Sequence, residues 1–172
     1  MPAGRPHALK AEGLGIFRRA RLVCIMAAAC LAGLVFDPPS GAVQQDAIAV
    51  IVNRGNQVEK LDESEVRRIY TDNVLMWPDR TPITVYDLTL QDTLRAAFSE
   101  RIFGRPPYKI AEEWAHLKIT NQAKNPPVTI KSQWLIIRRV SQEKGAIGYV
   151  SLSTVKGNPD VKVVLAFSPA ER

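Results

Sequence analysis

The feature that most constrains the fold is the unbroken apolar run from Ala47 to Val52, which is rich in β-branched residues. A strand that faces water on one side alternates apolar and polar residues, and this run does not alternate. It therefore predicts a central strand that is covered on both faces. A sheet covered by helices on both sides is typical of α/β domains.

Further helix and strand signals follow along the chain. Asp62 and Glu65 have capping-box spacing, and Ser132 is a cap candidate for a later helix with Trp134, Ile137 and Val140 on its buried side. The predicted elements after the first strand are a helix beginning at 62, a strand at 83–86, helices at 92–103, from 106 and from 132 to 145, and strands at 146–150 and 161–166. The order β-α-β-α-α-α-β-β predicts an α/β domain whose small mixed sheet is flanked by helices.

The first 42 residues have the layout of a secretory signal peptide. Arg18, Arg19 and Arg21 precede an apolar run at 22–36, and small residues follow up to Ala42. The run would span about 22 Å as a helix, less than the roughly 30 Å of a bilayer core. We therefore expect cleavage after Ala42, a mature domain at 43–172 and a periplasmic location, with an uncleaved anchor in the inner membrane as the alternative.

Charge and cysteine content narrow the function classes. Residues 1–42 hold five of the 23 basic and two of the 17 acidic residues, so half of the net charge of +6 lies in the export segment. The rest is nearly balanced, which argues against a nucleic-acid partner. Both cysteines, Cys24 and Cys30, also lie in that segment, so the mature domain has no disulfide, cysteine nucleophile or thiolate metal site.

Catalysis has little support in the residues. Glu112, Glu113 and His116 lie together on one predicted helix, but two metal ligands at i and i+4 without a third are better explained as a solvated helix face. We expect no enzyme, no cofactor and no metal. A small enzyme that uses these three residues is the minor alternative.

Two other groups of residues favour structural interpretations. Trp77, Trp114 and Trp134 are a possible stacking set, but the last two lie on helical stripes and are more simply core residues. Two arginine pairs, at positions 67–68 and 138–139, each have acidic residues close by in the sequence. This pattern is typical of solvated helix faces.

The strand-to-helix loop at 87–95 is the best candidate for a ligand site. Such a turn directs free backbone N–H groups and the positive end of a helix dipole toward one point, where an anion can bind. The candidate ligand-binding residues are Thr89, Gln91, Asp92, Thr93 and Arg95. The favoured alternative is that Asp92 or Thr93 caps the helix with its own oxygen, since Asp87 and Asp92 would repel an anion.

Several stretches, taken in order, resemble the type 2 periplasmic binding proteins, and among them the phosphate ABC transporter substrate-binding proteins. The matching stretches are Ile48-Ala-Val-Ile-Val-Asn53 with its Arg-Gly-Asn loop, 61–70 with Trp77 after it, Leu94-Arg95-Ala96-Ala97-Phe98, and Gly145-Ala-Ile-Gly-Tyr149-Val150. The resemblance implies a single periplasmic-binding-protein-like lobe, where family members that capture phosphate have two. It also implies export and recognition of a small anion such as phosphate.

The chain departs from that family at the phosphate cradle. The family has Ser-Gly-Thr at the start of the helix and an arginine four residues before the serine. Here the cradle positions read Asp92-Thr93-Leu94, and Leu88 stands at the arginine position. Only Arg95, just after the cradle, matches the family's pattern.

Two functions remain open at the level of sequence. The first is a solute-binding-protein-like domain that binds phosphate or another small anion for transport or sensing. The second is an interaction module without ligand that binds another exported protein or its own copy, suggested by the leucines Leu88, Leu90 and Leu94, expected to be exposed.

The export signal predicts the N-terminus of the mature protein. Intact-mass spectrometry of the protein recovered from an exporting bacterial host is expected to give a chain that begins at Val43. A chain that keeps residues 22–36 and sediments with membranes would support the anchored alternative instead.

Overall fold

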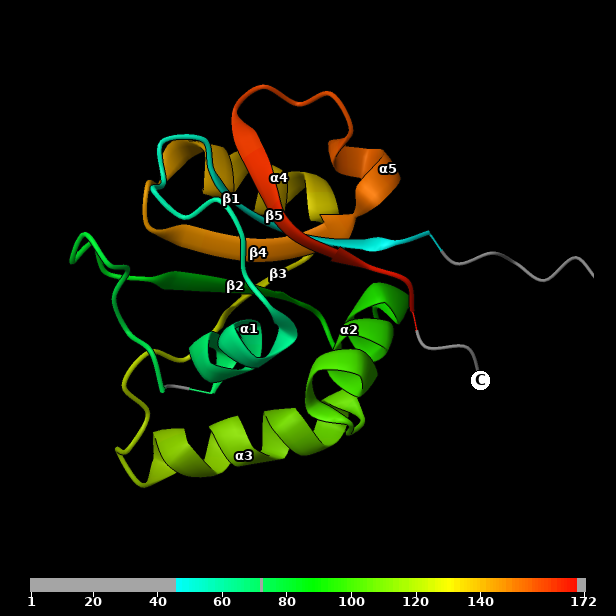
Figure 1. Ribbon diagram of the computed structural model, residues 1–172. Helices are drawn as coiled ribbons and strands as arrows, with labels where there is room; N and C mark the ends of the chain where they lie inside the picture. The colour runs from blue at the N-terminus through cyan, green and yellow to red at the C-terminus, as the bar shows by residue number, and fades with distance from the viewer. Residues whose placement is uncertain (1–45, 72, 170–172) are drawn as a thin grey trace, which may run out of the picture. The chain divides into compact units, whose positions relative to one another are not determined.

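The computed structural model describes residues 46–71 and 73–169, so the predicted signal peptide at 1–42 lies outside the described residues. The elements of the described part follow one another from β1 to β5 (Figure 1). They are β1 (Ile48–Asn53), α1 (Glu63–Tyr70), β2 (Thr84–Leu88), α2 (Thr93–Phe103), α3 (Pro107–Ile119), β3 (Val128–Ile130), α4 (Gln133–Gln142), β4 (Ala146–Ser151), α5 (Leu152–Val155) and β5 (Val161–Phe167).

The described strands form one five-stranded mixed sheet with the order β3-β2-β4-β1-β5. β2 pairs in parallel with β3 and β4, whereas β1 pairs antiparallel with β4 and β5. The predicted small mixed sheet is confirmed. β1 is interior, and its residues from Ile48 to Val52 have no exposed surface. The prediction that β1 is central is correct only in that sense, because β4 is the middle strand.

Neighbouring residues of β4 face the two helical layers. A Cβ atom at Gly148 would lie 2.5 Å from Ile136 and 3.5 Å from Val140, which are both on α4. The next side chain, Tyr149, packs against Phe98 of α2 and Tyr70 of α1. Figure 1 shows α4 and α5 on one side of the sheet and α1, α2 and α3 on the other.

The structure adds two elements to the predicted order and extends the second strand by two residues at its end. β3 and α5 have three and four residues, too few for a periodic signal. The second strand runs to Leu88 and not to Tyr86, because Asp87 and Leu88 pair with Thr129 and Ile130 of β3. Asp87 therefore belongs to a strand and not to the predicted loop.

Capping residues act as predicted. The Asp62 side chain accepts a hydrogen bond from the Glu65 backbone, and the Glu65 side chain accepts one from the Asp62 backbone. Ser132 caps α4 through the Leu135 N–H group. Gly104 ends α2 with φ of 66°, a left-handed conformation that glycine adopts without strain.

The expected burial of Trp134 is wrong, since its side chain is 68% exposed. The buried side of α4 is formed by Ile136, Ile137 and Val140. Trp134 is two residues, or about 200°, from Ile136 and so points the other way. α4 also ends at Gln142, before the predicted stop at Gly145.

The close approach of α4 to the sheet predicts a cost for any side chain at position 148. Gly148→Ala is expected to lower the free energy of unfolding by about 1–3 kcal/mol, because the added methyl group overlaps Ile136. Urea denaturation measures this value. Gly55→Ala, where the nearest atom is a side-chain oxygen at 3.3 Å, is the matched control and is expected to change stability by about 0.5 kcal/mol or less. Equal effects of the two variants would contradict the packing described here.

Candidate functional site

A buried ion pair lies at the end of β2. Asp87 Oδ2 is 2.8 Å from Arg95 Nη2, and the two side chains are 11% and 7% exposed. Asp87 Oδ1 accepts a hydrogen bond of 2.5 Å from the Tyr149 hydroxyl, and Arg95 Nη1 donates to the carbonyl oxygen of Leu88. Each charge is therefore paired, as burial of a charge requires.

Three elements bring these groups together. Asp87 lies on β2, Tyr149 on the neighbouring strand β4 and Arg95 in the first turn of α2. Phe98, one turn further along α2, stacks on the Tyr149 ring with a centroid distance of 3.8 Å and an interplanar angle of 2°. Because this stack attaches α2 to β4, it also holds Arg95 beside Asp87.

Burial raises the pKa of both Asp87 and Tyr149. It raises the pKa of Asp87, while the charge of Arg95 and the Tyr149 hydrogen bond act in the opposite direction. Burial, and then the charge of Asp87, raises the pKa of Tyr149 well above its usual value, so its hydroxyl stays a donor at physiological pH. Among the described residues, the Nε–H group of Arg95 is buried and has no hydrogen-bond partner.

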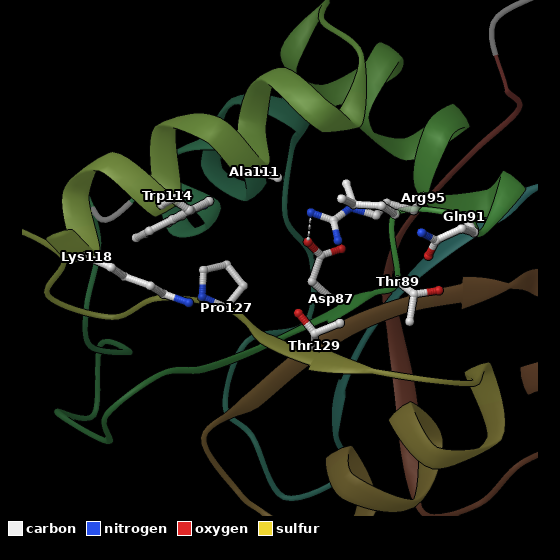
Figure 2. Close-up of a pocket in the computed structure, with 11 residues that line it drawn as sticks. Asp87, Thr89, Gln91, Arg95, Ala111, Trp114, Lys118, Pro127 and Thr129 are labelled. Atoms are coloured by element: carbon white, nitrogen blue, oxygen red, sulfur yellow. Dashed lines mark ion pairs between the residues drawn. The ribbon is translucent and has the colours of Figure 1, made fainter.

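A cavity of about 410 Å³ lies beside the ion pair. Its lining comes from the end of β2, the start of α2, one face of α3, and β3 with the residues before it (Figure 2). The lining residues are Asp87, Thr89, Leu90, Gln91, Arg95, Ala111, Trp114, Ala115, Lys118, Pro127 and Thr129.

The predicted site residues divide between this cavity and its surroundings. Thr89, Gln91 and Arg95 line it. Thr93 instead faces a separate hollow of about 120 Å³ that Gln133 also lines. Arg95 lines the cavity as expected, but its positive charge is balanced by Asp87, which the sequence did not predict.

Asp92 caps α2, as the favoured alternative predicted. Its side chain accepts a hydrogen bond of 2.8 Å from the Leu94 N–H group. One of the free amides that attract anions to a helix N-terminus is thus occupied by the protein's own carboxylate.

Sequence reasoning missed the α3 side of the cavity. Ala111, Trp114, Ala115 and Lys118 are spaced at i, i+3, i+4 and i+7, which places them on one helix face. That spacing was available as a signal. No comparable signal pointed to Thr129, which joins the cavity through the pairing of β3 with β2.

The expectation of three exposed leucines is wrong for two of them. Leu88 is fully buried in the sheet and Leu94 is 9% exposed, whereas Leu90 is 43% exposed. Leu88 is buried because the second strand is longer than predicted, and Leu94 because it lies on the sheet side of α2. The observation that suggested an interaction module therefore reduces to one residue.

The three tryptophans have separate environments. Trp77 is buried and donates to the Gly145 carbonyl, Trp114 lines the cavity, and Trp134 is exposed. Of the three, only Trp114 belongs to the candidate site.

The remaining charged groups form solvated faces, as predicted. Glu112 pairs with Lys109 at 3.0 Å, Glu113 pairs with Arg105, and His116 is exposed. The arginines at 67–68 and 138–139 are exposed as well. Within 46–71 and 73–169, no group of three or more histidine, cysteine or acidic residues is arranged to hold a metal ion.

Comparison with known proteins identifies the family. Residues 42–170 match the family model described as the PBP superfamily domain, so the chain belongs to the PBP superfamily. No curated protein matches the chain. In the part that the structure describes, no helix is both long and apolar enough to cross a bilayer.

Solved structures with the same fold are described as phosphate-transport or phosphate-binding proteins. A phosphate ABC transporter substrate-binding protein with bound phosphate from Clostridium perfringens, described as putative, is 23% identical with a TM-score of 0.55 and covers 69% of this chain. An ABC-type phosphate transport receptor from Vibrio cholerae is 19% identical with a TM-score of 0.54 and covers 69%. A possible phosphate binding protein from Planctomyces limnophilus is 18% identical with a TM-score of 0.53 and covers 70%. The match spans 44%, 45% and 42% of these three chains, which is less than half of each.

The buried pair predicts a pH-dependent loss of stability in one variant. Arg95→Met leaves Asp87 buried without its counter-charge and is expected to cost about 3–5 kcal/mol of unfolding free energy at neutral pH. The folded pKa of Asp87 already lies above its usual value of 3.8 and rises further without Arg95. A raised folded pKa means that the folded state takes up the proton first as the pH falls, so the deficit is expected to shrink at acid pH.

Urea titrations at neutral and mildly acid pH measure this difference. Arg101→Met breaks the exposed pair with Glu63 and is the matched control, with an expected cost of about 1 kcal/mol or less. A deficit for Arg95→Met that is the same at both pH values would contradict the assignment to Asp87.

Proposed function

We propose that this chain is an exported solute-binding protein that binds phosphate or another small anion in the cavity beside Asp87 and Arg95. The observation that carries the proposal is the charge of the lining. Two cationic side chains and one acidic side chain line the cavity. The acidic one is already paired, so the surplus is positive.

Asp87 and Asp92 do not repel an anion as strongly as their sequence positions suggest. Asp87 directs one oxygen to Tyr149 and the other to Arg95. Asp92 is engaged as the cap of α2. A carboxylate whose oxygens are already hydrogen-bonded by donors presents less negative potential to its other neighbours.

Lys118 supplies the positive charge that is not neutralised. It lines the cavity from the last turn of α3 and is exposed. Within residues 46–71 and 73–169, no carboxylate lies within ion-pair distance of it. The Thr89 and Thr129 hydroxyls and the Gln91 amide add hydrogen-bond donors elsewhere along the cavity lining.

An anion bound here would use side chains in place of the family's backbone cradle. Two of the cradle positions hold Asp92 and Leu94. The Asp92 side chain accepts a hydrogen bond from one backbone N–H group of the helix start, and the Leu94 side chain is buried. The cavity is also open to solvent at Gln91 and Lys118, which are exposed. We therefore propose weak binding that is strongly screened by salt, in a role in transport or sensing outside the cytoplasmic membrane.

Calorimetry with inorganic phosphate at low ionic strength tests the proposal. Phosphate is expected to bind the purified protein and to raise its Tm by mass action. Lys118→Met is expected to weaken binding by about tenfold, because it removes a charge-assisted contact. Lys156→Met, at an exposed position after α5 and outside the cavity lining, is the matched control and is expected to leave the affinity unchanged. Absence of heat and of a Tm shift with millimolar phosphate, sulfate and organic acids would overturn the proposal.

A further inference from the structure

We propose that the anion taken by this cavity carries a compact apolar body that packs against Trp114, in the space that Ala111 and Ala115 leave open. The inference rests on the proposed function and specifies its ligand class as a small organic anion. Four features of the cavity support it: its size, the composition of its α3 wall, the position of Lys118 and the arrangement of its two ends.

The size of the cavity exceeds what an inorganic oxyanion needs. Its volume of about 410 Å³ equals the liquid volume of roughly fourteen water molecules. Sites for small organic molecules begin at about 300 Å³. A phosphate ion alone would leave most of the space to water.

The α3 wall is apolar where it borders the ion pair. Trp114 is 9% exposed, so most of its ring is already packed into the protein. Ala111 and Ala115, three residues before and one after it, have the smallest side chains with a Cβ atom, and Pro127 also lines the cavity. Larger residues at 111 and 115 would close this space, and alanine leaves it open next to a flat aromatic ring.

The positive charge lies next to this apolar wall. Lys118 is four residues after Trp114, one turn along the same helix face, and both line the cavity. A ligand that contacts both must carry its negative charge close to its apolar part. A benzene ring bearing a phosphate or a carboxylate has this arrangement.

The opposite end of the cavity is polar. Figure 2 shows Thr89 and Gln91 on the far side of Asp87 from Trp114 and Lys118. A hydroxyl or amide substituent on the ligand body would meet hydrogen-bonding groups there, whereas a long apolar chain would not. The cavity thus favours a short body with a polar far end over a fatty acid.

Paired probes separate the contribution of the body from that of the charge. Calorimetry on the purified protein compares phenyl phosphate, inorganic phosphate and phenol under the same low-salt buffer. Phenyl phosphate is expected to bind at least about tenfold more tightly than inorganic phosphate, because its ring buries apolar surface against Trp114. Phenol, which has the ring without the charge, is expected to bind more weakly than phenyl phosphate.

A cavity-filling variant locates the body. Ala115 is exposed on α3, so Ala115→Leu is compatible with the helix and fills the space beside Trp114. It is expected to abolish the advantage of phenyl phosphate while binding of inorganic phosphate persists. Ala115→Ser, which adds little volume, is the matched control and is expected to retain the advantage.

The outcomes distinguish this inference from the function on which it rests. Equal affinities for phenyl phosphate and inorganic phosphate, or an advantage that survives Ala115→Leu, would overturn the organic body and leave anion binding in place. Phenol binding as tight as phenyl phosphate would overturn the requirement for a charged group. Failure of all three probes to bind would overturn both proposals.

Discussion

The contact between Asp87 and Arg95 is the interaction on which the rest of the candidate site depends. A carboxylate at the end of a buried strand needs compensation, and Arg95 and Tyr149 supply it from two different elements. Satisfying that requirement fixes the first turn of α2 against the sheet. The cavity forms beside this turn, so the same contact that neutralises Asp87 also determines where a ligand would meet the protein.

The packing of the sheet serves this arrangement. Gly148 lets α4 approach one face of β4, and Tyr149 extends from the other face to reach Asp87 and Phe98. A strand alternates its side chains between two faces, so neighbouring residues can serve two layers independently. Both layers contribute to the core, and the layer that contains α2 also positions the polar groups of the site.

Membership of the PBP superfamily accounts for the fold, whereas the chemistry of the cavity depends on the lining residues of this chain. The matched structures are described as phosphate-transport or phosphate-binding proteins, yet at most 23% of aligned residues are identical and the match spans less than half of each of these chains. The lining contains a neutralised arginine, one surplus lysine and an α3 wall of Trp114 between two alanines. These are the features that favour an anion with an apolar part.

The sequence alone determined what local patterning and capping chemistry specify. The apolar run of β1, the capping box of Asp62 and Glu65, the Gly104 helix end and the Asp92 cap each depend on residues within a few positions of one another, and each is present as predicted. Tertiary structure decided everything that depends on which elements become neighbours. β3 exists only by pairing with β2, and that pairing moved Asp87 and Leu88 from a loop into the sheet. Pairing of Arg95 with Asp87, and the convergence of Lys118 and Thr129 on one cavity, join residues that are distant along the chain or on separate elements. Such contacts follow from packing across the core, which periodicity along a single element cannot specify.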